Sequence, residues 1–240
     1  VEQLMHGIKN TKIISPSTDC IVPIGEELLE KGLKKEVNAE FYTAVARSPD
    51  VYKGIPFVVE VALAYGGEQP SDESARLLRF ANRVPLLYQQ SACATFKSVV
   101  GTNWKSYGIQ QSGGALPQGP LTIAISLVSV WPPFTSEAKE AIAHYPEIIK
   151  EIKLALQDAG RKLGAYVNKK KRAGIEQERV NIFERYIPEV ADSLSRLTGE
   201  NKNKLIESMK KMLEKNKEFI QQNKGELKGE VEPRPKGEKG

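Results

Sequence analysis

The chain has 240 residues, of which 40% are apolar and 27% are charged. This composition can build a sizeable core, which argues against a wholly disordered chain. No stretch approaches the roughly 18 apolar residues that a membrane-spanning helix needs, so we expect no membrane partner. The first residue is Val1 rather than Met and no secretion signal follows it. We therefore expect a cytoplasmic protein and a sequence that is a piece of a longer polypeptide.

The chain holds two cysteines, Cys20 and Cys93, and two histidines, His6 and His144. They are too few and too far apart in sequence for a zinc site or a disulfide framework. We expect reduced thiols and no metal site. A Cys–His pair could in principle act as a nucleophile, but no local signature supports it.

Alternating apolar residues predict a sheet, with strands expected at residues 39–47, 57–65, 76–87 and 121–131. The first two are separated by a connection with Gly54 and Pro56, which favours an antiparallel hairpin. Helices are expected at 26–37 and 91–100, and residues 110–120 form a loop rich in Gly, Pro and Gln. The order β-β-β-α-β predicts an α/β fold of the two-layer α+β kind, a sheet covered by helices on one face.

Helices dominate the rest of the chain. A short helix is expected at 136–143, and a long one begins at Pro146, with Glu147 in its first turn. Pro188 predicts the start of a second tract at 189–197, and a third is expected at 204–220. Residues 221–240 have almost nothing to bury, which predicts a disordered tail.

A cluster of cations follows within the long helix, namely Arg161, Lys162, Lys169, Lys170, Lys171 and Arg172, with no acid between 161 and 172. Such a row can attract the phosphates of double-stranded DNA without reading bases. A solvated helix face explains the same pattern equally well.

The later helices carry an apolar set with no remaining core to join within this chain. Exposed apolar stripes of this kind mark partner contacts, so we expect a docking surface there. Its residues are Leu194, Leu197, Leu205, Ile206, Met209 and Leu213.

Phosphate-binding loops, dinucleotide fingerprints, serine-hydrolase elbows and zinc-protease pairs are absent from the sequence. Lys139 nevertheless stands near the start of the expected helix at 136–143. A cation there is disfavoured by the helix dipole unless it helps free amides to hold an anion. Thr135 and Ser136 could cap that helix and contact phosphate oxygens. A solvated lysine paired with Glu137 or Glu140 is the simpler alternative.

Several stretches resemble the transducer part of the B subunit of DNA topoisomerase VI, an archaeal type IIB enzyme. They are residues 18–29, 77–87, 104–109 and 133–140, and the resemblance continues through 182–190. It covers about residues 15–195, and the matching stretches occur in one order. Residues 1–17 would be the end of a helix-two-turns-helix module and 18–182 the transducer with its long helix. Residues 183–220 would dock on the A subunit of that enzyme, and 221–240 would be the tail.

The resemblance implies an ATP-dependent enzyme that relaxes supercoiled DNA by passing one duplex through another. Its B subunit dimerises on binding ATP, and a lysine on the transducer's strand-to-helix loop reaches the ATP γ-phosphate. Lys139 matches that loop position, beside Thr135 and Ser136. The implied partners are the A subunit, which cuts DNA, together with a second copy of the B subunit, and double-stranded DNA. ATP and Mg²⁺ would be bound mainly outside these residues, and no catalytic residue of the ATPase or of DNA cleavage is expected within them.

Two alternatives stay open at the level of sequence. One is a nucleic-acid- or protein-binding adaptor of the same fold without ATPase activity, like the meiotic relatives of the B subunit. The other is a small-molecule kinase of the sugar and mevalonate kinase fold, although its Gly/Ser-rich phosphate loop is missing.

Overall fold

The computed structural model describes residues 2–11 and 17–226, and it describes side-chain burial as far as residue 215. The chain divides into two compact units, residues 1–169 and residues 170–240. A helix, α1 (Glu2–Asn10), precedes the sheet in the first unit.

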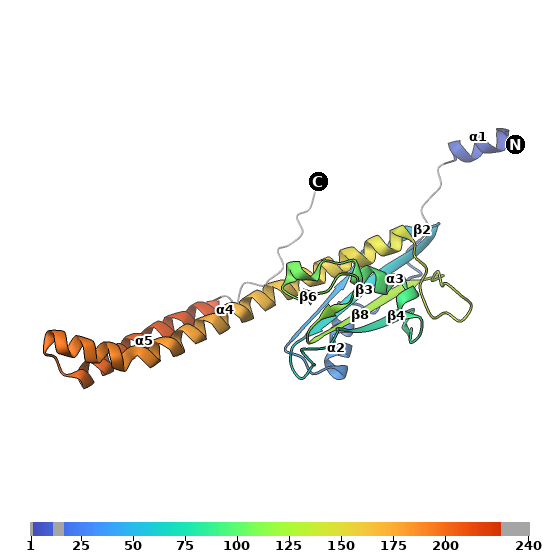
Figure 1. The fold of residues 1–240 in the computed structure, drawn as a ribbon. Helices are drawn as coiled ribbons and strands as arrows, with labels where there is room; N and C mark the ends of the chain where they lie inside the picture. Colours follow the sequence, from blue (N-terminus) through green and yellow to red (C-terminus); the bar gives the residue numbers. More distant parts are fainter. Residues whose placement is uncertain (1, 12–16, 227–240) are drawn as a thin grey trace. The chain divides into compact units, whose positions relative to one another are not determined.

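The central strands of the main sheet are β3 (Ile55–Tyr65) and β8 (Leu121–Ser129), which pair antiparallel with Val61 opposite Ile125. On the other side of β3 lies β1 (Phe41–Ala46), also antiparallel, and the short β2 (Asp50–Tyr52) forms a hairpin with β3. On the other side of β8 lies β4 (Arg76–Ala81), which runs parallel to it. The strand order β1-β3-β8-β4-β5 confirms the predicted sheet (Figure 1).

The strand predicted at residues 76–87 is two strands in the structure. β4 turns at Asn82 and Arg83, which have φ angles of 47° and 69°, into the short antiparallel β5 (Val84–Pro85). Two consecutive left-handed residues make the tight turn that suits a two-residue hairpin. The turn and Pro85 both end the ladder, so the sheet has a short edge here. Within the expected loop at 110–120, β6 (Gln110–Gln111) and β7 (Pro117–Gln118) form a small separate sheet.

Helices cover both faces of the main sheet, so the expectation of a single covered face is wrong. The main core joins one face of β3 and β8 to α3 (Ala94–Val100) and to α4 (Pro146–Thr198), through residues such as Leu63, Ile125 and Ile152. Side chains alternate along a strand, so the neighbouring residues Ala62 and Ala124 face the other way. They pack with Leu33 of α2 (Glu26–Glu36) in a second, smaller core.

The helix α4 has 53 residues and begins at Pro146 as predicted. Arg47, just after β1, fixes its first turns, because its guanidinium pairs with Glu151 at 3.1 Å and with Asp158 at 3.2 Å. Pro188 lies inside α4 and does not start a new helix, which corrects the expectation of a separate tract at 189–197.

The second unit contains the later part of α4 and α5 (Lys202–Glu226), joined by a tight reversal (Figure 1). Gly199, at φ 73°, ends α4 with a bond from its N–H to the Ser195 carbonyl. This is the usual left-handed end of a helix. Lys202 pairs with Asp192 across the turn and Arg196 pairs with it within α4. Both lower the pKa of the Asp192 carboxyl, and Lys202 contributes most. Because α5 reaches Glu226, the expected tail is helical over 221–226, and its remainder, 227–240, lies outside the described residues.

Candidate functional site: the Lys139 loop

Residues 133–143, here the Lys139 loop, lie between β8 and α4 and close on themselves. Phe134 and Ile142 form an antiparallel bridge. The Thr135 N–H donates to the Ala141 carbonyl at 2.9 Å, and the Ala143 N–H to the Pro133 carbonyl at 2.7 Å. These bonds hold the base of the loop together, so its tip at 136–139 projects from a closed neck.

The closed neck is anchored in the core of the first unit. Ile142 is fully buried, its carbonyl accepts a bond from the Ala94 N–H at 2.9 Å, and its own N–H points at the Cys93 sulfur. Gln89 donates to the Glu140 carboxylate at 2.6 Å. The loop is therefore bonded to the start of α3 and to the segment before it.

The helix predicted at residues 136–143 is not present. In a helix the Ala143 N–H would bond the Lys139 carbonyl, but here it bonds Pro133 across the loop. Thr135 and Ser136 cap no helix, and the Thr135 hydroxyl donates to Ala141 at 3.3 Å. A helix dipole therefore has no bearing on Lys139.

Lys139 ends a tight turn instead. Its N–H donates to the Ser136 carbonyl at 3.1 Å, and its φ is 55°, in the left-handed region that costs a non-glycine residue about 1 kcal/mol. Its side chain is exposed, as are those of Ser136 and Glu137. The tip therefore presents one ammonium and one hydroxyl that can meet the oxygens of an anion from outside the loop.

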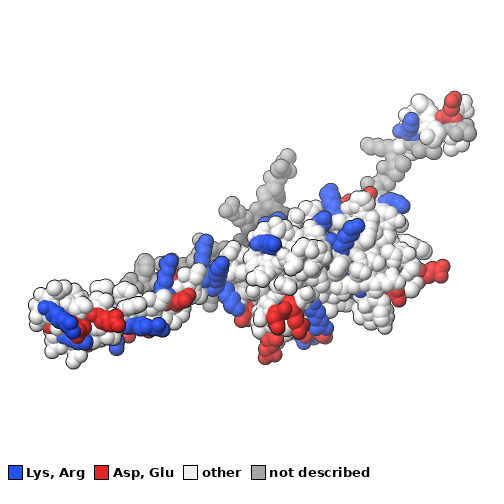
Figure 2. Space-filling view, viewed as in Figure 1, with Lys and Arg blue, Asp and Glu red and all other residues white. Residues whose placement is uncertain are grey.

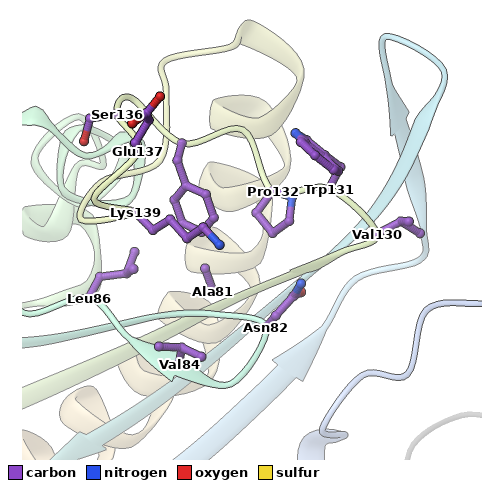
Figure 3. A pocket seen from close by; sticks show the side chains of 11 residues that line it. Ala81, Asn82, Val84, Leu86, Val130, Trp131, Pro132, Ser136, Glu137 and Lys139 are labelled. Carbon is purple, nitrogen blue, oxygen red and sulfur yellow. The ribbon is translucent and has the colours of Figure 1, made fainter.

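A cavity of about 680 Å³ opens between the Lys139 loop and the β4–β5 turn. Figure 3 shows the Lys139 side chain extending into it, whereas the Glu137 carboxylate points away from it. The cavity is lined by Ala81, Asn82, Val84, Leu86, Val130, Trp131, Pro132, Phe134, Ser136, Glu137 and Lys139. The sequence did not indicate this cavity, because its two walls are about 50 positions apart in the chain.

The basic run of α4 is divided by the structure. Arg161 pairs with Asp158 one turn earlier, and Lys162 donates to the Ala44 carbonyl at 3.2 Å. Lys169, Lys171 and Arg172 are exposed, and so is Lys170. Figure 2 shows Lys and Arg side chains gathered along this part of α4, with acids among them.

The predicted docking residues are mostly half-buried rather than exposed. Leu194, Leu205, Ile206, Met209 and Leu213 are all half-buried, and only Leu197 is strongly exposed, at 83%. In the same unit, Ile187 and Ala191 of α4 are buried. These side chains are thus less exposed than the sequence suggested, and their role in docking stays a prediction.

Another set of apolar side chains on α4 is exposed, and the sequence pattern alone did not single it out. We call it the outer stripe, and it consists of Ile182, Phe183, Tyr186, Val190 and Leu197. Their separations of one, three, four and seven residues place them on one side of a helix. The same periodicity would have revealed the stripe in the sequence, had Pro188 not suggested a break.

Similarity to known proteins places the chain in a family. A family model described as "Topoisomerase VI B subunit, transducer" matches residues 16–179. The chain belongs to this family. It is 46% identical to the B subunit of type 2 DNA topoisomerase 6 from Methanococcoides burtonii, over 81% of this chain and 31% of that protein. It is 45% identical to the protein of the same name from Thermococcus gammatolerans, over 86% of this chain and 36% of that one.

The chain therefore spans about a third of the length of these curated relatives. Among solved structures, the B subunit of DNA gyrase from Myxococcus xanthus is similar with a TM-score of 0.37 at 21% identity, over 57% of this chain and 38% of that one. Membership in the transducer family replaces the kinase alternative. None of the described helices is long and apolar enough to cross a membrane.

The motif at residues 104–109 has a structural role in this transducer. Trp104 is fully buried and donates from its indole nitrogen to the Val99 carbonyl at 2.9 Å. Tyr107, in the same short helix η2 (Trp104–Tyr107), lies against Gly160 and Gly164 of α4. Lys105 is exposed. This stretch therefore helps to pack α4 on the domain.

An aromatic cluster joins the segment just after the Lys139 loop to the β2–β3 hairpin of the transducer. The rings of Tyr145 and Tyr52 are 4.0 Å apart, and the Lys53 ammonium lies 4.8 Å from the centre of the Tyr145 ring. The Tyr52 side chain and then the Lys53 charge lower the pKa of Tyr145, and burial raises the pKa of Tyr52. Tyr145 directly precedes α4, so the cluster fixes the point where the loop becomes helix.

Proposed function

We propose that this transducer relays the nucleotide state of a topoisomerase VI B subunit to its DNA-cleaving partner. The observation that carries the proposal is the position of Lys139, at the tip of a closed loop whose end leads directly into α4. A contact made by Lys139 acts on a loop that is bonded to the start of α3 and to Gln89 before it. The chain then continues into the 53-residue α4, which would transmit a displacement of the loop.

ATP is proposed as the bound nucleotide, with Mg²⁺. The residues of the Lys139 loop fit one phosphate group only: Lys139 supplies a point charge and Ser136 a hydroxyl. Within the described ranges, no group of three or more His, Cys, Asp or Glu is placed to hold a metal ion. We therefore propose that nucleotide and metal are held mainly by the part of the protein that this chain does not span. In this proposal Lys139 acts as a sensor of the phosphate, to which it offers a point charge.

The test uses the complete B subunit in complex with the DNA-cleaving subunit. Lys139→Ala should slow ATP-dependent relaxation of supercoiled DNA at least about tenfold, because the ammonium–phosphate contact would be lost. Lys105→Ala, another exposed lysine of the same unit, serves as the matched control. If Lys139→Ala relaxes DNA and hydrolyses ATP at the same rates as Lys105→Ala, the sensor role is overturned. If no ATP dependence exists even in the wild-type complex, the adaptor alternative is correct.

We further propose that the helical hairpin docks on the DNA-cleaving subunit through the outer stripe of α4. Five exposed apolar side chains in one row, two of them aromatic, are the composition of an interface core. The half-buried set that includes Leu205 and Met209 then acts indirectly, by holding the hairpin in shape. Leu197, the one exposed member of the predicted set, belongs to both sets.

Double-stranded DNA is proposed to contact the basic run at Lys169, Lys170, Lys171 and Arg172. Arg161 and Lys162 are less suited to this role, since Arg161 is paired with Asp158 and Lys162 is bonded to β1. Contacts of this kind neutralise phosphates and read no sequence. A second copy of the B subunit is also proposed to join on binding ATP.

A further inference from the structure

We propose that the cavity beside the Lys139 loop binds a small apolar monoanion, such as an aromatic carboxylate or sulfonate, with the Lys139 ammonium as its counter-ion. The binding itself does not depend on the proposed nucleotide response. Only its consequence for the enzyme, described below, rests on that function.

The walls of the cavity favour an apolar ligand. Most of its lining is apolar, and three large side chains around it are left unusually bare: Trp131 is 73% exposed, Val84 62% and Val130 58%. Bare apolar surface around a hollow marks a place where a ligand or partner removes it from water. Trp131 and Phe134 are aromatic members of the lining against which an aromatic ligand can pack. The volume of about 680 Å³ lies within the usual range for sites of small molecules.

The charged side chains of the lining favour a ligand with a single negative charge. Of the eleven lining residues, Lys139 is the cation and Glu137 the acid. Figure 3 shows the Lys139 nitrogen directed into the hollow and the Glu137 carboxylate directed away from it. A single anionic group meets the ammonium beside apolar walls, where the attraction is stronger than in open water. A ligand with several negative charges would find no second cation among these lining residues and would approach Glu137.

Occupancy of the cavity would hold Lys139 on the inner side of its loop. Lys139 supplies the one ammonium of the lining, so an anion in the cavity and a phosphate outside the loop would compete for it. On the proposed function, such a ligand therefore weakens the nucleotide response of the complete enzyme. The cavity is in this sense a control site, because its ligand and the nucleotide compete for the Lys139 side chain.

The test titrates the 240-residue chain with 8-anilinonaphthalene-1-sulfonate and follows energy transfer from tryptophan. The chain has two tryptophans, Trp104 and Trp131, and only Trp131 lines the cavity. We expect a transfer signal that Trp131→Phe reduces, because Trp104 in the same unit remains as a more remote donor. Lys139→Gln should weaken the binding about tenfold, the worth of one partly shielded ion pair. Val84→Asp, which places a carboxylate on the exposed rim without disturbing the core, should weaken it by at least as much.

Two controls make the outcome decisive. Lys105→Gln removes the same charge elsewhere in the unit and should leave the affinity unchanged. Naphthalene-1-sulfonate should displace the probe more strongly than neutral 1-naphthol from the wild-type chain, and the two should be equal in Lys139→Gln. Equal affinity of Lys139→Gln and Lys105→Gln, or displacement by 1-naphthol as strong as by the sulfonate, would overturn the proposal. Either result would show that the hollow binds apolar groups without regard to charge, and neither bears on the relaxation assay of Lys139→Ala.

Discussion

Gly67 lies in the loop after β3, where it crosses the chain that leads into β1. Its φ is 71°, and a Cβ on it would lie 2.4 Å from the Asn38 carbonyl oxygen and 2.7 Å from the Ala39 Cα. Both contacts are with backbone, which cannot rotate away as a side chain can. Gly54, in the β2–β3 turn, also has a positive φ of 79°, but nothing lies within 4 Å of its would-be Cβ.

The different surroundings of Gly54 and Gly67 predict different losses of stability on substitution by alanine. Gly54→Ala should lower the free energy of unfolding by about 1 kcal/mol, the cost of a left-handed alanine. Gly67→Ala should lower it by about 2–4 kcal/mol, because overpacking adds to that cost. Urea unfolding followed by tryptophan fluorescence reports on this unit, which contains both tryptophans. Equal losses in the two variants would show that the loop gives way without cost.

At the scale of elements, the packing of η2 on α4 depends on small residues. A Cβ at Gly160 would lie 2.6 Å from the Tyr107 ring, and one at Gly164 would lie 3.3 Å from the Tyr107 Cα. Glycine weakens a helix by about 1 kcal/mol relative to alanine, so its presence here reflects the close approach. Gly174, further along the same helix, has nothing within 4 Å.

Gly160 and Gly174 should therefore respond in opposite directions. Gly174→Ala should raise the stability of α4 by up to about 1 kcal/mol, seen as greater helix content on heating by circular dichroism. Gly160→Ala gains the same propensity but displaces Tyr107, which costs about 1–3 kcal/mol. A Gly160→Ala chain that unfolds at a higher temperature than the wild type would contradict the contact.

At the scale of the whole molecule, α4 runs through both compact units, with a buried face in the first and an exposed apolar row in the second. One continuous helix thus connects the Lys139 loop to the proposed contact with the DNA-cleaving subunit. The proposed DNA contact lies where the two units join in sequence.

Docking through the outer stripe predicts that Tyr186→Asp weakens the association with the DNA-cleaving subunit more than tenfold, because a buried carboxylate would replace an aromatic anchor. The matched control is Met212→Asp on α5, since Met212 is also apolar and 65% exposed. Co-purification and titration with the labelled partner measure the effect. Similar losses in both variants would point to a general effect of charge on the hairpin.

The DNA contact predicts a change in salt dependence. Reversal of Lys169, Lys171 and Arg172 to Glu should weaken DNA binding by the assembled enzyme and flatten its dependence on salt by up to about 3 in log–log slope, since each phosphate contact contributes roughly 0.9. Reversal of Lys204, Lys210 and Lys215 on α5 changes the net charge equally and should have little effect. An unchanged slope in the first variant would place the DNA contact elsewhere.

The sequence alone determined most of the sheet, through local pattern, and the family, through its resemblance to known members. Alternation predicted three main strands near their observed bounds, because β3 and β8 bury whole rows of side chains, and Pro146 predicted the start of α4.

Tertiary structure decided the rest. The Lys139 loop has helix-forming residues, yet the bonds from Thr135 and Ala143 across its neck replace helical ones. Pro188 is tolerated inside α4, where Ile187 and Ala191 beside it are buried. The cavity exists only because the β4–β5 turn and the loop after β8 meet on parallel neighbouring strands. Such contacts join residues far apart in the chain, so no local preference encodes them.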